Sequence, residues 1–107
     1  MKHRYRVYII DLKKSVMKKS RFKKMNPDYI PNKPCVYVGS TANSVEKRFA
    51  QHLEGVRSNA FAREFGKRLR YSDMQDIRPR KTRASIEQKE AEVARELRKR
   101  GWGVWSN

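Results

Sequence analysis

A single carboxylate stands among the apolar residues of the last predicted helix. At about 100° per residue, Ile86, Val93, Ala94 and Leu97 fall on one stripe of the segment IEQKEAEVARELRKR, and Glu90 falls inside that stripe. The other acidic residues of the segment fall on its margin or its far side. Because an unpaired buried charge is costly, Glu90 is expected either to form an ion pair with one of the many basic residues or to bind a metal ion.

Two residues with complementary chemistry occur together on an earlier predicted helix. In the segment VEKRFAQHLEG, Arg48 and His52 are four residues apart and therefore neighbours on one face. Arginine can neutralise phosphate charge with a planar fork of donors, and histidine titrates near neutral pH. Taken separately, each residue also fits an ordinary role, as a surface cation and as a core histidine.

Three strands are predicted to position these side chains. Arg4–Leu12 and Cys35–Gly39 are rich in β-branched and aromatic residues, so they predict two paired strands. Leu69–Ile77 is a candidate for the third strand. We therefore expect an α+β domain with a small, mainly antiparallel three-stranded sheet flanked by helices.

Apolar spacing and end signals predict three helices after the second strand, and the first of them is expected to pack through Val45, Phe49, Leu53 and Val56. The first of these helices is expected to begin after the capping residue Asn43 or Ser44 and to end at Gly55, and the second to begin after Asn59 and to end at Gly66. The third is expected to begin with a capping box of Ser85 and Gln88 and to end at Gly101.

The composition predicts one basic domain, residues 1–107, with a polyanionic partner. The chain has 27 Lys and Arg against 11 Asp and Glu, a formal net charge of +16, which the phosphates of a nucleic acid or an anionic membrane surface would neutralise. Cys35 is the only cysteine, which excludes an intrachain disulfide and a cysteine-rich zinc site. No apolar run approaches the roughly 18 residues of a membrane span or follows Met1 as a leader, so we expect a cytoplasmic, intracellular protein.

A cationic excursion at about residues 13–34 separates the first two predicted strands. Its apolar residues Val16, Met17 and Phe22 are expected to pin it to the domain, so that its cations face DNA phosphates. These cations are Lys13, Lys14, Lys18, Lys19, Arg21, Lys23 and Lys24. If the excursion is instead a loop that contacts nothing, the binding surface would be Arg57, Arg63, Lys67 and Arg68.

The pattern as a whole resembles the GIY-YIG nuclease superfamily. The matching motifs are Val7-Tyr8-Ile9, Tyr37-Val38-Gly39 followed by Ser40-Thr41, Glu46-Lys47-Arg48 with His52, and Glu90 with Val93-Ala94. The stretch YVGSTANSVEKRFAQHL is the most specific part. The resemblance covers nearly the whole chain, and it implies a minimal nuclease domain without an appended targeting module.

Three departures accompany this resemblance. Val7 stands where the family has a glycine, the excursion is longer than the usual tight hairpin, and the candidate for the family's late asparagine is Asn107. Gly39 keeps the family residue, and we expect it to be needed either for a positive φ or for a close approach at the active site.

The resemblance implies hydrolysis of DNA phosphodiester bonds with one divalent cation, Mg²⁺ or Mn²⁺. Glu90 would be the protein ligand of that cation, since a hard ion accepts oxygen ligands. Arg48 would neutralise the pentacovalent phosphate. Tyr8, Tyr37 or His52 would orient or deprotonate the attacking water, with nearby cations favouring the ionised form of a tyrosine.

Two rival interpretations stay open at this point. One is a non-catalytic, basic nucleic-acid-binding protein on the same fold, and the other is a basic RNA-associated protein outside the family. Cleavage of plasmid DNA with and without Mg²⁺ separates an endonuclease acting on duplex or branched DNA from the first rival.

Overall fold

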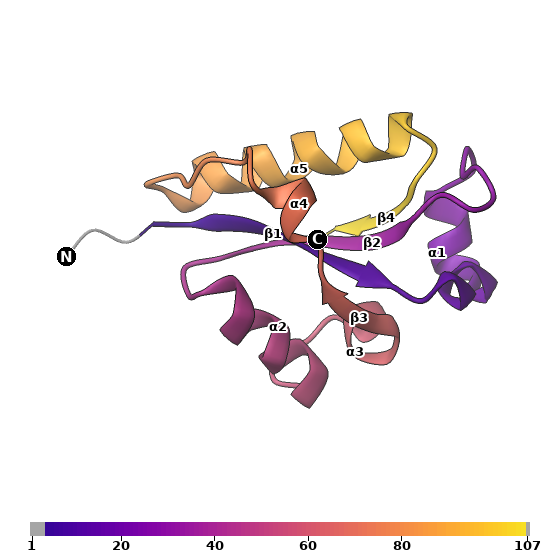
Figure 1. Ribbon diagram of the computed structural model, residues 1–107, viewed down its shortest axis with the longest axis horizontal. Coiled ribbons are helices and arrows are strands. Elements are labelled where there is room, and N and C mark those ends of the chain that lie inside the picture. Colours follow the sequence, from indigo (N-terminus) through magenta and orange to yellow (C-terminus); the bar gives the residue numbers. More distant parts are fainter. Residues whose placement is uncertain (1–3, 107) are drawn as a thin grey trace.

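A mixed four-stranded sheet runs through the molecule, whose computed structural model describes residues 4–106 (Figure 1). The strand order is β3-β1-β2-β4, in which β1 pairs antiparallel with β2 and β3, and β4 pairs parallel with β2. The strands are β1 (Arg6–Leu12), β2 (Cys35–Thr41), β3 (Gly66–Leu69) and β4 (Gly103–Ser106). The α+β class is as expected, whereas the three-stranded, mainly antiparallel sheet is corrected.

The corrections arise at the third and fourth strands. The third strand is Gly66–Leu69 rather than Leu69–Ile77, because the ladder with β1 ends where the Arg70 N–H donates to Ile9 O. The chain then turns into the short helix α4 (Tyr71–Met74). The tail after Gly101, for which no strand was predicted, forms β4 along β2.

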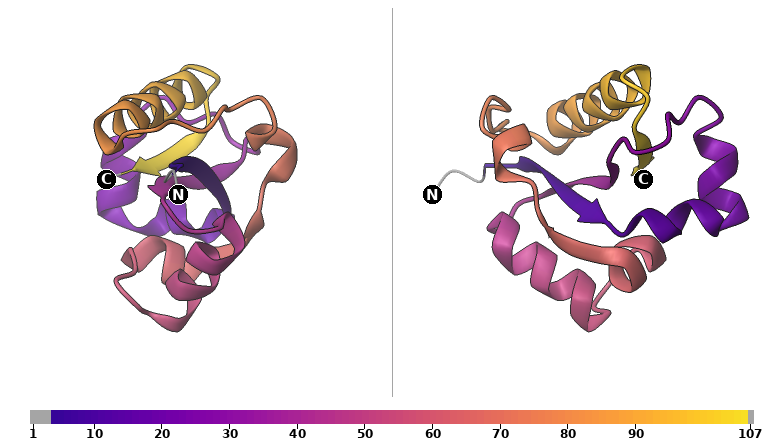
Figure 2. Two further views of the ribbon diagram at one scale, coloured as in Figure 1. Left: turned by 90° about the vertical axis from the view of Figure 1, so that its left-hand side faces the viewer. Right: turned by 45° about the vertical axis from the view of Figure 1, so that its right-hand side comes forward.

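Helices cover both faces of this sheet (Figures 1 and 2). The long helix α5 (Arg83–Lys99) packs over the face formed by residues such as Val7, Ile9 and Val38. The opposite face is covered by α2 (Val45–Glu54), α3 (Ala60–Phe65) and the excursion. With helices on both faces, β1 and β2 are buried along nearly their whole length, which explains their almost continuous apolar sequence.

The predicted helix ends are mostly confirmed. Ser44 caps α2 by accepting the Lys47 N–H, and Asn59 caps α3. Gly55 and Gly101 follow α2 and α5 with φ of 86°, a left-handed conformation that favours glycine. The start of α5 is corrected, because Thr82 accepts the Ser85 N–H and the helix begins at Arg83.

The apolar stripe predicted for α2 is partly wrong. Leu53 and Val56 are 45% and 48% exposed, although the spacing placed both on the packing face. His52 is buried in their place, 1% exposed. The helix therefore turns a histidine rather than a leucine toward the sheet.

The excursion between β1 and β2 is folded rather than loose. It contains the short 3-10 helix η1 (Lys14–Lys18) and the helix α1 (Ser20–Met25). Val16 and Phe22 are completely buried, which confirms that apolar residues pin the excursion to the domain. All seven of its predicted DNA-contacting cations are exposed.

No helix within residues 4–106 combines the length and the apolar character of a membrane crossing.

A buried asparagine closes the outer edge of β4. The Asn26 side chain accepts the Val104 N–H at 2.7 Å and donates to Val104 O at 3.1 Å. One amide thus satisfies the N–H and the carbonyl of Val104, which this edge strand would otherwise leave unpaired. Cys35, on the neighbouring strand, is buried and free, as predicted for a small apolar residue.

Candidate active site

A polar pocket of about 300 Å³ opens at the edge of β2, beyond the end of β4. The last pair between these strands is Val38 with Ser106, so within the described residues Gly39–Thr41 extends past β4. Side chains alternate along β2, and Ser40 therefore projects to the α5 face while Tyr37 projects to the α2 face. The pocket is lined by Tyr8, Tyr37, Ser40, Arg48, Arg83, Glu87 and Glu90.

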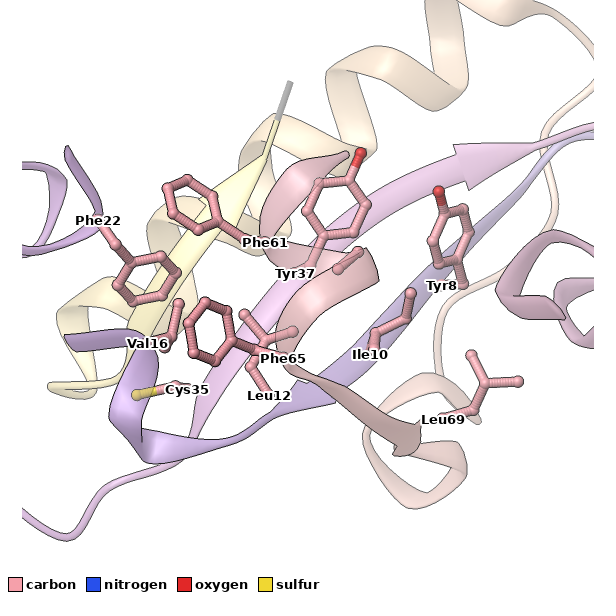
Figure 3. Close-up of a cluster of buried hydrophobic side chains, with 11 residues drawn as sticks. Tyr8, Ile10, Leu12, Val16, Phe22, Cys35, Tyr37, Phe61, Phe65 and Leu69 are labelled. Atoms are coloured by element: carbon pink, nitrogen blue, oxygen red, sulfur yellow. The ribbon is translucent and has the colours of Figure 1, made fainter. Parts of the chain in front are cut away.

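Two buried tyrosines stand side by side on adjacent strands. Tyr8 and Tyr37 have ring centroids 6.1 Å apart, and their hydroxyls point to the same side (Figure 3). Gly39 pairs with Tyr8 across the sheet, and a Cβ at Gly39 would overlap the phenol of Tyr8. Of the two reasons predicted for this glycine, close approach holds, since Gly39 is not among the described residues with positive φ.

His52 lies behind Tyr8 and fixes its phenol. Nε2 of His52 is 2.7 Å from the Tyr8 hydroxyl oxygen, and the Asn59 N–H donates to Nδ1 of His52 at 3.2 Å. Burial, helped by the positive charge of Arg48, lowers the pKa of His52 from 6.5 to about 4. The neutral ring thus carries its proton on Nε2 and donates it to Tyr8.

The Tyr8 phenol is hard to ionise in the protein alone. Burial raises the pKa of Tyr8 well above its usual value, and Tyr37 raises it further. Arg48 acts in the opposite direction through its charge and a hydrogen bond, but burial dominates. Arg48 thus favours the ionised form of Tyr8, as expected of a nearby cation, but burial outweighs it and the pKa of Tyr8 stays raised.

Arg48 is held by the turn that follows α2. Its Nη2 donates to Arg57 O at 2.8 Å, and its Nη1 donates to Val56 O and to Gln51 Oε1, each at 3.2 Å. Arg57 has φ of 46°, so the chain turns back at this point and presents both carbonyls. The guanidinium is thereby oriented from one side while it lines the pocket from the other.

Glu90 faces the pocket from α5 and is 6% exposed, which confirms its predicted place among the apolar residues. Its Oε2 accepts a hydrogen bond of 2.8 Å from the Ser40 hydroxyl. This bond links the middle of α5 to the free end of β2.

The structure thus brings the five predicted catalytic residues together. Tyr8, Tyr37, Arg48 and Glu90 line one pocket, and His52 contacts it through Tyr8. Their individual roles stay predictions. Asn107, the candidate for a late asparagine, lies outside the described residues.

None of the predicted DNA-contacting residues lines the pocket, although Arg57 O accepts a hydrogen bond from Arg48, which does. The excursion is at the far end of β1 and β2 from the first turn of α5 (Figure 1). Arg63, Lys67 and Arg68 are exposed around α3 and β3, and the two on β3 lie within 3.8 Å of the Asp11 carboxylate.

The sequence interpretation assigned no role to three pocket residues. Ser40 appeared only as part of a motif, and Arg83 and Glu87 were given no place in the site. A usable signal existed, because Arg83 and Glu87 precede Glu90 by seven and three residues and so share its face of the helix.

The chain matches a known protein family. The family model described as the GIY-YIG catalytic domain matches residues 4–103. Neither the curated proteins nor the solved structures yield a significant match.

Proposed function

The chain belongs to the GIY-YIG family, a family of nucleases, and we propose that it is a divalent-metal-dependent endonuclease that hydrolyses phosphodiester bonds in duplex or branched DNA. The observation that carries this proposal is the convergence of Tyr8, Tyr37, Arg48 and Glu90 on one polar pocket. These side chains come from two strands and two helices, so packing alone gives no reason for four polar groups to meet there. The net charge of +16 supports a polyanionic substrate.

The residues at Glu90 fit a hard divalent cation such as Mg²⁺ or Mn²⁺. Glu90, Glu87 and the Ser40 hydroxyl offer only oxygen donors, the class that such ions prefer. No cluster of three or more acidic, histidine or cysteine side chains suited to a metal occurs within residues 4–106. A cation held at Glu90 and Glu87 would therefore take water and a phosphate oxygen as its further ligands. A cation bound here would stabilise negative charge on the phosphate and favour the ionised form of Tyr8.

Arg48 is assigned to the phosphate in the transition state. Its carbonyl partners at Val56 and Arg57 hold the guanidinium before the substrate arrives, so little orientation remains to be gained during the reaction. A preoriented cation stabilises developing charge without reorganising during the reaction.

Tyr8, rather than His52, is assigned to the attacking water. Both ring nitrogens of His52 are engaged, one as the acceptor of Asn59 N–H and the other as the donor to Tyr8, so the ring has no lone pair for a water proton. The same Nε2–H bond stabilises negative charge on the Tyr8 oxygen. The ionised Tyr8 then takes the water proton as the new phosphorus–oxygen bond forms, and the leaving sugar oxygen departs and is protonated from solvent.

Incubation of the purified protein with supercoiled plasmid tests this function. We expect nicked and linear products with Mg²⁺ or Mn²⁺, and none when EDTA is added. If the protein binds the plasmid but leaves it intact at every metal concentration, the endonuclease proposal fails and the non-catalytic DNA-binding alternative replaces it.

A further inference from the structure

A second cleft of about 520 Å³ adjoins the catalytic pocket. The two share Ser40, Arg48 and Arg83 in their linings, so they form one continuous depression. The second cleft extends from these residues past the segment 41–43 to Arg57, in the turn after α2. It therefore lies between the residues that precede α2 and the first turn of α5.

Charge is separated along this depression. Glu87 and Glu90 line the catalytic pocket, whereas three arginines and no acidic residue line the second cleft. A divalent cation would be attracted to the first part and an anion to the second. Arg48 stands at the junction, where it can act on a phosphate held between them.

Arg83 is oriented by an aromatic ring. Its guanidinium lies over the Tyr5 ring, 5.1 Å from the centroid, and this cation–π contact restricts the side chain without occupying its N–H donors. Within residues 4–106, Arg83 takes part in none of the side-chain ion pairs closer than 4.0 Å. Three cations on and beside β3 do form ion pairs, since Lys67, Arg68 and Arg70 all contact Asp11.

We propose that the second cleft is a phosphate subsite, in which Arg83 and Arg57 bind the phosphate next to the scissile one on the same DNA strand. The inference rests on the proposed endonuclease function and adds to it the direction in which the strand leaves the catalytic pocket. Arg83 spans both cavities, so it would hold the strand in register with Glu90 and Arg48.

Binding of a duplex oligonucleotide, measured without divalent metal so that no cleavage occurs, tests this subsite. Arg83→Gln should raise the Kd at least about tenfold and reduce the slope of log K against log salt by about 0.9, the value for one phosphate contact. Arg95→Gln removes the same charge from an exposed position of the same helix outside both cavities, and it should change neither quantity. Arg83→Lys keeps the charge, so it should preserve the slope while losing part of the affinity.

A site-specific measurement follows once the cleavage position is mapped. A single uncharged methylphosphonate beside that position should weaken binding by wild-type protein and have no further effect on Arg83→Gln. Equal Kd values and slopes for Arg83→Gln and Arg95→Gln would overturn the subsite. That outcome is distinct from failure of the proposed function, because absence of plasmid cleavage by the wild type leaves this comparison of binding intact.

Discussion

The hydroxyl oxygen of Tyr8 lies 2.7 Å from Nε2 of His52, and the Asn59 N–H at Nδ1 makes His52 the donor of this bond. Arg48 and His52, which are four residues apart on α2, thus differ in their place at the site. Arg48 lines the pocket directly, while His52 is buried behind it and contacts it through Tyr8.

Burial of His52 predicts a pH dependence of stability. Unfolding restores its ordinary pKa of 6.5, whereas the folded value is about 4, so below pH 6.5 the unfolded chain binds a proton that the folded chain does not. The free energy of unfolding should therefore decrease by about 3 kcal/mol as the pH falls from 6.5 to 4. Urea unfolding at several pH values measures this loss.

His52→Gln is the control for that experiment, because glutamine does not titrate. The difference between the two pH profiles isolates the histidine from the acidic residues. Parallel profiles for wild type and variant would show that His52 is not the buried neutral group described.

The raised pKa of Tyr8 predicts an unusual pH–rate profile. If Tyr8 accepts the water proton, only its ionised fraction is active, so the cleavage rate should rise with pH by up to roughly tenfold per pH unit, until the pH reaches the pKa that Tyr8 has with the cation bound. A His52 base with a pKa of about 4 would instead give a flat profile around neutral pH. Single-turnover cleavage at saturating Mg²⁺ separates the two, and Tyr8→Phe should lose about 100-fold or more in rate.

Gly39→Ala should displace Tyr8. The added methyl overlaps the Tyr8 phenol and crowds Tyr37, so we expect a loss of about 1–3 kcal/mol in stability together with a large loss of activity. The double variant Gly39→Ala, Tyr8→Ala tests the cause, because the alanine at 39 should then cost little beyond Tyr8→Ala alone. If the loss of stability in the double variant equals the sum of the losses in the two single variants, the alanine at position 39 does not clash with Tyr8.

The central part of the fold was predictable because local sequence and tertiary packing agree there. β1 and β2 are apolar runs buried on both faces, and Ser44 and Gly55 mark the ends of α2. The late part was less predictable. β4 consists of four residues that become a strand only because β2 offers a free edge, and its outer side is completed by Asn26, 78 residues away.

The site was predictable to the extent that it depends on spacing along one helix. Glu90 stood out against its apolar stripe, and Arg48 with His52 stood out as a pair. The Ser40 contact with Glu90 joins residues 50 positions apart, and the tautomer of His52 depends on a backbone N–H of α3's cap residue. Neither relationship has a local sequence signal.

The excursion predicts a separate contribution to DNA affinity. Replacing Lys18, Lys19, Lys23 and Lys24 by Gln should flatten the slope of log K against log salt by up to about 3.6, since all four are exposed and each phosphate contact contributes about 0.9. Stability should change little, because Val16 and Phe22 still anchor the excursion. Arg95→Gln with Lys99→Gln, on the exposed side of α5, is the control and should leave the slope unchanged. An unaltered slope in the fourfold variant would move the binding surface away from the excursion.

Metal-dependent cleavage by Glu90→Gln is the most direct measurement of the proposed chemistry. The amide keeps the size of the carboxylate and an acceptor for Ser40, but it removes the charge needed to hold a divalent cation. We predict that Glu90→Gln abolishes Mg²⁺-dependent plasmid cleavage while DNA binding is largely retained, and that Glu92→Gln, on the exposed side of α5, cleaves like the wild type. Cleavage by Glu90→Gln at the wild-type rate would contradict the assignment of this pocket as the catalytic site.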